Sequence, residues 1–297
     1  MTDFRCGSVA LVGKPNVGKS TLLNAFLGEK VAIVSPKPQT TRGNLAGIHQ
    51  DAEAQIVFYD TPGFHDPKNP LARFMLSQVQ EALDGCDLAL FLVDAADSVG
   101  EDEELAAGWL RKSKKPVLFV INKTDLVEYP RLLDLERKGK VLGPWPQFRV
   151  AAKTGAGVKE LLAEVKGRLP EGPPLFPEDQ LTDKNLRELV AELVREQCFL
   201  QLTREIPYGV AVVIEEFKEN PEPDPVVVTA TLYVEKESHK GIVIGAGGRQ
   251  LKSLGSAARE GIEALLGRKV FLQLWVKTLK NWRKDEDKLK RLGYGLT

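Results

Sequence analysis

A short segment near the N-terminus has the residue types of a phosphate-binding loop. Residues 13–20 read G-K-P-N-V-G-K-S, which fits G-x-x-x-x-G-K-[ST] between an apolar run and a segment with helical periodicity. Gly13 and Gly18 let backbone N–H groups converge on phosphate oxygens, and the helix start adds partial positive charge. Lys19 is expected to reach the outer phosphates and Ser20 to bind Mg²⁺. The other residues expected to contact a nucleotide here are Asn16, Val17 and Thr21.

Two further segments carry groups that a bound triphosphate needs. A buried-strand pattern at 55–59 ends at D-T-P-G, residues 60–63, where Asp60 is expected to hold Mg²⁺ through water and the Gly63 N–H to approach a γ-phosphate. The polar stretch 35–42 holds two prolines and predicts a mobile loop. A threonine hydroxyl there can complete the Mg²⁺ shell in the triphosphate state, and we favour Thr41 over Thr40. The predicted metal set is thus Ser20, Thr41 and Asp60, and the predicted catalytic set is Lys19, Thr41 and Gly63.

A second group of motifs has the chemistry to select a base. Residues 122–125 read N-K-T-D after an apolar strand pattern. The Asp125 carboxylate can accept hydrogen bonds from N1–H and N2–H₂ of guanine, which adenine cannot supply. Asn122 and Lys123 are expected to brace the loop and pack on the ring. At 151–153, A-A-K follows a short strand pattern, so an N–H near Ala152 is expected to contact guanine O6, with Ala151 beside it and Lys153 stacking on the base.

Length and composition favour an ordinary globular protein of two domains. The chain has 297 residues, and its apolar strand patterns at 9–12, 55–59, 88–94 and 116–121 alternate with helical segments. That alternation predicts a doubly wound α/β sheet. The three cysteines form no C-x-x-C pair, the three histidines (His49, His65 and His239) are too scattered for a metal site, and the N-terminus has no apolar signal segment. We therefore expect a cytoplasmic protein.

The net charge of zero conceals a strong asymmetry. Residues 1–172 hold 22 Lys and Arg against 22 Asp and Glu. Residues 173–235 hold 5 against 13, whereas residues 236–297 hold 14 against 6, so the last third divides into halves of net charge −8 and +8. One face of the C-terminal region can therefore be strongly positive, which favours an anionic partner.

The C-terminal third contains a second recognition motif. The Pro-rich segment 169–177 reads as a stiff linker. A helix is expected at 183–202 with Thr182 or Asp183 as its N-cap, then strands at 208–217 and 226–236. Residues 245–248 read G-A-G-G between two helical patterns, with a final strand at 269–276. In the order α-β-β-α-α-β, this G-x-x-G predicts an α+β type II KH domain, whose loop clamps about four nucleotides of single-stranded RNA. The expected RNA contacts are Ile244, Gly245, Ala246, Gly247, Gly248, Arg249 and Lys252. The basic tail, 277–291, is either an additional RNA contact or a solvated helix.

The ordered motifs resemble a known family. Residues 7–170 resemble the translation-factor-like P-loop GTPases, and a GTPase domain followed by one KH domain resembles the Era family over essentially the whole chain. Further matching stretches are Q-T-T-R at 39–42, F-P-E-D at 176–179, I-P-Y at 206–208 and L-W-V-K at 274–277. The expected division is a GTPase domain at 1–172, a linker at 173–180 and a KH domain at 181–297.

The resemblance implies a function. It implies a bacterial-type, Mg²⁺-dependent GTPase that alternates between GTP and GDP, binds the 3′ end of 16S ribosomal RNA through its KH loop and assists maturation of the 30S subunit. It also implies weak, peripheral association with the inner membrane, and we expect a monomer. In this mechanism, GTP with Mg²⁺ orders the two switch loops (35–42 and Phe64–Asn69) and makes the RNA surface accessible, and by linkage RNA tightens GTP binding.

At three positions, the residue type bears on how closely this chain follows related GTPases. Phe64 stands where Ras-like GTPases place the glutamine that orients the attacking water, and Ala151 stands where the family usually has serine. Asn16 matches the position that helps related families bind K⁺, which gives the hypothesis of a K⁺ site. The alternative function is a GTPase switch whose C-terminal domain binds a protein, or an anionic membrane through its basic tail, with G-x-x-G serving only as a turn.

Overall fold

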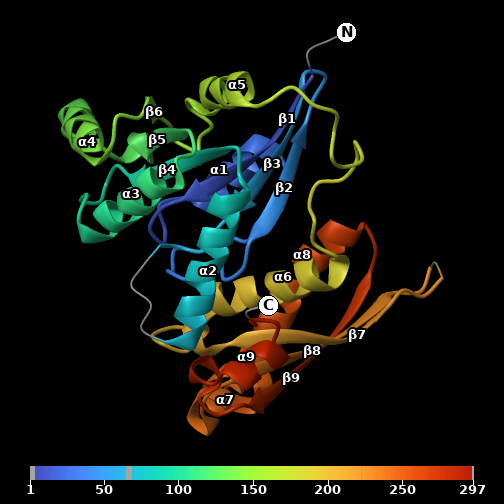
Figure 1. Ribbon diagram of the computed structural model, residues 1–297. Helices are drawn as coiled ribbons and strands as arrows, with labels where there is room; N and C mark the ends of the chain where they lie inside the picture. The colour runs from blue at the N-terminus through green and yellow to red at the C-terminus, as the bar shows by residue number, and fades with distance from the viewer. Residues whose placement is uncertain (1–3, 65–68, 222, 296–297) are drawn as a thin grey trace. The chain divides into compact units, whose positions relative to one another are not determined.

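The computed structural model describes residues 4–64, 69–221 and 223–295, which form two compact units (Figure 1). The first unit runs to Asp183, except for two short segments, Ser35–Lys37 and Asn69–Phe74. These segments group with the second unit, which continues from Lys184 to the C-terminus. Within the described residues, no helix combines the length and the apolar character needed to cross a membrane.

The first unit is built on a six-stranded sheet in the order β2-β3-β1-β4-β5-β6. Its strands are β1 Arg5–Val12, β2 Leu45–Gln50, β3 Ala54–Asp60, β4 Leu88–Asp94, β5 Val117–Asn122 and β6 Gln147–Arg149. Its helices are α1 Lys19–Leu27, α2 Pro70–Gly85, α3 Glu101–Ser113, η1 Thr124–Leu126, α4 Tyr129–Leu142 and α5 Val158–Arg168. Only β2 runs antiparallel to its neighbour, so the carboxyl ends of the other strands lie at one edge of the sheet.

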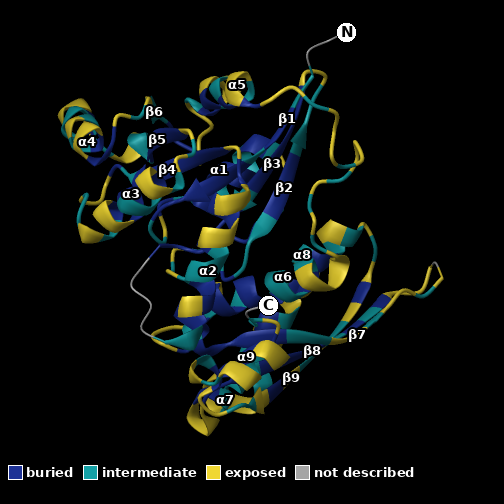
Figure 2. Ribbon diagram, viewed as in Figure 1, coloured by how far each residue is buried: buried dark blue, intermediate teal, exposed yellow. Residues whose placement is uncertain are grey.

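Alternating side chains bury both faces of this sheet. In β4, Leu88, Leu90 and Leu92 belong to one core cluster, which α1 and α5 complete. Their neighbours in sequence, 89, 91 and 93, belong to the other cluster, which α2, α3 and α4 complete. Figure 2 shows the strands as the most buried elements of this unit. Since both faces are covered, these strands are apolar at nearly every position, and the predicted doubly wound sheet is confirmed.

The second unit has a three-stranded sheet in the order β7-β8-β9. Its strands are β7 Ala211–Lys218, β8 Val226–Val234 and β9 Val270–Thr278, with β8 antiparallel to β7 and parallel to β9. Its helices are α6 Leu186–Gln201, η2 Pro207–Gly209, α7 Glu237–Ile244, η3 Ala246–Gly248, α8 Arg249–Leu266, η4 Trp282–Lys284 and α9 Glu286–Arg291. Val194 of α6 and Ile262 of α8 are among the buried residues that join these helices to the sheet. The order α-β-β-α-α-β confirms the predicted KH topology.

The start of α6 differs from the prediction. The helix begins at Leu186, because Asn185 caps it: Asn185 Oδ1 accepts from the Glu188 N–H at 3.0 Å, and Glu188 Oε2 accepts from the Asn185 N–H at 3.1 Å. The predicted caps, Thr182 and Asp183, are wrong. Asp183 instead accepts from the Ala46 N–H at 3.1 Å, so this residue is held at the edge of β2 before the helix starts.

Candidate nucleotide-binding and nucleic-acid sites

The loop between β1 and α1 has the close-packed backbone that phosphate binding requires. Gly18 adopts a φ of 96°, and a Cβ at this position would overlap the Asn122 amide. A Cβ at Gly13 would overlap the Leu92 carbonyl. Two glycines are therefore required for the loop to turn against β4 and β5 before α1 begins at Lys19. Of the other predicted contacts here, Asn16 has a φ of 65°, Val17 is buried, and Thr21 lies half-buried in the first turn of α1.

The Lys19 side chain folds back over this loop. It is only 6% exposed, and its Nζ donates to the carbonyls of Gly13 and Lys14, both at 2.9 Å. Burial lowers the pKa of Lys19 to about 8, although the nearby Asp60 carboxylate opposes this shift. An anion brought to this loop would raise the pKa of Lys19 again, because phosphate oxygens stabilise the ammonium form.

The three residues predicted to bind metal come together at the carboxyl end of β3. Ser20 Oγ donates to Asp60 Oδ2 at 2.7 Å, and Thr41 Oγ1 donates to the same oxygen at 3.0 Å. The two hydroxyl oxygens lie 3.2 Å apart. Two hydroxyls and a buried carboxylate are hard oxygen donors, which fits the ligand preference of Mg²⁺. The structure therefore joins residues from three separate motifs into one candidate metal site.

The D-T-P-G segment packs directly on the phosphate loop. A Cβ at Gly63 would overlap Pro15, and the Phe64 N–H donates to the Gly13 carbonyl at 3.0 Å. The Phe64 side chain is fully buried and packs edge-to-face on Trp109, with ring centroids 5.0 Å apart. In this conformation, the side chain that replaces the glutamine of Ras-like proteins lies in the core. Residues 65–68 of the predicted second switch segment, including His65, lie outside the described residues.

Asn122 links the phosphate loop to the predicted base-binding loops. Its side chain is 1% exposed, donates through Nδ2 to the Val17 carbonyl at 2.8 Å, and accepts through Oδ1 from the Ala152 N–H at 3.0 Å. The Ala152 N–H is the predicted donor to guanine O6, so a guanine here would share this donor with Asn122. Ala151 is buried, while Asp125 and Lys153 are exposed on the two loops that Asn122 joins. Lys123, which is half-buried, pairs with Asp94: its Nζ lies 2.6 Å from Asp94 Oδ2.

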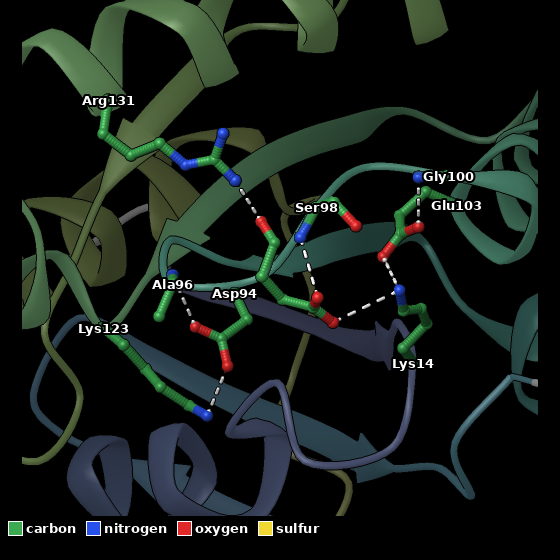
Figure 3. A network of polar contacts seen from close by, with 9 residues as sticks. Lys14, Asp94, Ala96, Ser98, Gly100, Glu103, Lys123 and Arg131 are labelled. Atoms are coloured by element: carbon green, nitrogen blue, oxygen red, sulfur yellow. Dashed lines mark hydrogen bonds and ion pairs between the residues drawn. The ribbon is translucent and has the colours of Figure 1, made fainter.

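The segment between β4 and α3 also belongs to the site, although the sequence did not predict it. Figure 3 shows the segment between β4 and α3 receiving Lys14 from the phosphate loop and Lys123 from N-K-T-D. Lys14 Nζ lies 2.9 Å from Glu103 and 3.4 Å from Asp97. Burial opposes the charged form, but the two carboxylates outweigh it and raise the pKa of Lys14. The available signals were a lysine at the second position of the loop and the acidic start of α3.

In the second unit, the G-x-x-G loop joins two helices end to end. Gly245, after α7, has a φ of 73°, and a Cβ there would overlap the backbone of Gln250. Gly248 has a φ of 78°, and α8 begins at the next residue. The predicted RNA contacts Ala246, Gly247, Arg249 and Lys252 are exposed, whereas Ile244, Gly245 and Gly248 are half-buried. Gln201 of α6 braces the start of α8 by accepting from Ser253 Oγ at 2.9 Å.

An open groove of about 430 Å³ runs from this loop between α8 and β9. Lys252 and Arg259 of α8 line one wall, and residues 270–274 of the edge strand β9 line the other. Phe271 on this wall is 57% exposed, so its ring is accessible to a ligand in the groove. Arg259 and Phe271 were not among the predicted contacts, because nothing in their local sequence distinguishes them from surface residues.

Comparison with known proteins gives matches to both units. A model of the 50S ribosome-binding GTPase family matches residues 8–123, and a KH-domain model matches residues 205–283. The chain is 46% identical over 292 residues to GTPase Era of Geobacter metallireducens, covering 98% of each chain. It is 44% identical over 293 residues to GTPase Era of Alkaliphilus metalliredigens, covering 98% of this chain and 99% of the relative.

Solved structures give the same result. Era of Aquifex aeolicus bound to GDP and AlF₄⁻ is 40% identical, with a TM-score of 0.93 over 99% of this chain and 100% of that chain. A second Era structure, in complex with Mg²⁺, GDPNP and nucleotides 1506–1542 of 16S ribosomal RNA, matches with the same identity, TM-score and coverage.

Proposed function

Because the chain belongs to the Era family of GTPases, we propose that it is a GTP-hydrolysing switch whose nucleotide state controls binding to the 3′ end of 16S ribosomal RNA. Residues 1–172 are the GTPase domain, 173–180 the linker and 181–297 the RNA-binding domain in this proposal. Assistance to assembly of the 30S subunit would follow from that RNA target. The protein would act in the cytoplasm as a monomer, and its contact with the inner membrane would be weak and peripheral.

The nucleotide half of the proposal rests on the cluster around Asp60. Bound Mg²⁺ would neutralise charge on the phosphates as hydrolysis proceeds. Ser20 and Thr41 would bind the ion directly, while Asp60 would hold its water ligands. Lys19 would exchange its carbonyl partners for phosphate oxygens, and the Gly63 N–H would orient the γ-phosphate. With Phe64 in place of a glutamine, water must be positioned by other groups, and K⁺ held near Asn16 would supply further positive charge.

The proposed recognition of guanine rests on the hydrogen bonds of the Asn122 side chain. Its two hydrogen bonds hold the phosphate loop and the loop at 151–153 at fixed positions on either side of the site. Asp125 would accept from the guanine N1–H and N2–H₂, and Lys153 would stack on the ring. The Ala152 N–H would contact O6 while still bonded to Asn122.

One observation carries the RNA half: the G-x-x-G loop opens into a groove with a basic wall and an exposed aromatic. Gly245 and Gly248 allow close approach of a phosphate to the backbone, and Lys252 and Arg259 lie along the helix that continues from the loop. Phe271, across the groove, offers a flat face on which a base can stack. A protein partner would not require this combination of cations and an aromatic platform.

The experiment compares two substitutions of equal size but different charge at Ala246, which is exposed in the loop. Ala246→Asp places a carboxylate where a phosphate would lie, whereas Ala246→Asn has the same shape without the charge. We expect the full chain with a GTP analogue to bind an oligonucleotide from the 16S 3′ end, the Asp variant to lose at least about tenfold in affinity, and the Asn variant to lose much less. Equal affinity of all three proteins would contradict the KH-loop contact. Binding of anionic vesicles but not of RNA would favour the membrane alternative.

A further inference from the structure

The segment between β4 and α3, residues 94–100, lies between the two halves of the nucleotide site. Figure 3 shows that side chains from three other parts of the first unit converge on it: Lys14 of the phosphate loop, Lys123 of N-K-T-D and Arg131 of α4. We refer to residues 94–100 with Glu103 as the acidic bridge. It contains no residue of the predicted nucleotide-binding segments, so its role is indirect.

On the phosphate side, the bridge holds the loop through a buried ion pair. The Lys14 side chain is 18% exposed and that of Glu103 only 4%. Glu103 is itself fixed, because its second carboxylate oxygen accepts from the Gly100 N–H at 2.8 Å at the start of α3. Lys14 therefore has a rigid partner. The backbone carbonyl of Lys14 is also one of the two acceptors of the Lys19 ammonium.

On the base side, the bridge is attached by both backbone and side chains. The Ala95 N–H donates to the Asn122 carbonyl at 2.9 Å, and Asp94 pairs with Lys123 at 2.6 Å. Asp94 is oriented for this by accepting from the Ala96 N–H at 2.9 Å. Arg131 Nε donates to the Ala95 carbonyl at 3.3 Å, and its guanidinium also binds the Asp97 carbonyl.

We propose that Lys14 is a positioning residue for GTP binding and hydrolysis, acting through the acidic bridge. Its ion pair with Glu103 fixes the backbone of the phosphate loop, and the bridge ties the position of this loop to that of the loop that selects guanine. The two halves of the site then move as one body, so release of the phosphates and release of the base become a single event. Without the pair, Asn122 still couples the two halves, but each half opens separately more often and the nucleotide dissociates faster.

The test compares variants of Lys14 in the full-length protein, with labelled GDP as the probe. Lys14→Met keeps the aliphatic stem and removes the charge, and we expect GDP release to become about tenfold faster and kcat for GTP to fall. Lys14→Arg retains a cation and should restore release to near the original rate. Lys166→Met is the matched control, since Lys166 pairs with Asp51 before β3, at the edge of the sheet opposite the nucleotide motifs.

A double variant separates positioning from stability. Lys14→Met alone leaves Glu103 buried without its partner, which lowers the midpoint of thermal unfolding. Adding Glu103→Gln removes that charge and should restore the midpoint of thermal unfolding. GDP release should stay fast, because the phosphate loop still lacks its ion pair with α3. If the double variant recovers both properties, or if Lys14→Met releases GDP at the original rate, the positioning role is wrong.

Discussion

The Ser20 hydroxyl donates to Asp60 Oδ2 over 2.7 Å, which joins the first turn of α1 to the carboxyl end of β3. Thr41 reaches the same oxygen from the loop before β2. Three segments that are far apart in the chain therefore present oxygen atoms to one point. We therefore expect the affinity for Mg²⁺ to depend on each of the three residues.

Ser20→Ala tests the metal site. Loss of one oxygen ligand should raise the Mg²⁺ concentration that gives half-maximal GTP hydrolysis by at least about tenfold. A Mg²⁺ titration of the hydrolysis rate measures this, and chelation of Mg²⁺ should abolish activity in the unmodified protein. Ser238→Ala, which removes an exposed hydroxyl of α7 in the second unit, should leave the titration unchanged. An unshifted curve for Ser20→Ala would exclude Ser20 as a ligand.

Asp125→Asn tests base selection. The amide can no longer accept from both guanine donors, so GTP affinity should fall at least about a hundredfold. Because the new NH₂ group can donate to the 2-oxo group of xanthine, affinity for XTP should rise. Competition between the two nucleotides measures both changes, with the exposed Asp84→Asn as a control. A protein that still prefers GTP would show that another group reads the base.

The buried Lys19 gives a pH dependence with a defined sign. Its pKa is about 8, below its ordinary value of 10.5, so the ammonium loses its proton as the pH rises through about 8. GDP affinity should then fall by up to about tenfold per pH unit, because bound phosphate favours the protonated form. The lowered pKa also means that burial of Lys19 costs folding stability below pH 8. This cost decreases as the pH rises from about 8 toward 10.5, because the unfolded chain then binds more protons than the folded one.

Calorimetric titration with GDP on either side of pH 8 measures the affinity change. Lys19→Arg is the control, since a guanidinium stays charged throughout and should give a flat profile whatever its absolute affinity. If the unmodified protein is equally flat, its Lys19 is protonated throughout the range.

Phe271→Ala tests the groove between α8 and β9. Loss of one stacked base is worth about 1–3 kcal/mol, so affinity for a single-stranded oligonucleotide should fall on the order of tenfold or more. Phe271→Tyr keeps the ring and should bind normally. The salt dependence should be unchanged in both, because no phosphate contact is lost. In contrast, Lys252→Gln should make the slope of affinity against salt shallower by about one. Full affinity in Phe271→Ala would mean that RNA does not stack at this wall.

The parts of the molecule that could be predicted are those whose functional residues lie next to one another in the sequence. G-K-P-N-V-G-K-S, N-K-T-D and G-A-G-G carry their residue types and their strand or helix context together, so fold and motifs followed from local patterns. The Lys14–Glu103 pair did not, since a lysine in a loop and a glutamate in an acidic helix have many possible partners. Phe271 likewise becomes distinctive only when β9 is placed at the sheet edge beside α8. The start of α6 was missed because Asp183 caps no helix and binds Ala46 instead, a contact that depends on tertiary structure.

The most direct test of the proposed switch is RNA affinity in two nucleotide states. Fluorescence anisotropy of a labelled oligonucleotide from the 16S 3′ end, at fixed salt, would compare the full chain saturated with GDPNP and Mg²⁺ against the chain saturated with GDP. We predict tighter binding with GDPNP, and by linkage the same factor of tightening in the affinity for GDPNP when RNA is present. Equal affinity in the two states would contradict nucleotide control, and the absence of binding in both would remove RNA as the target.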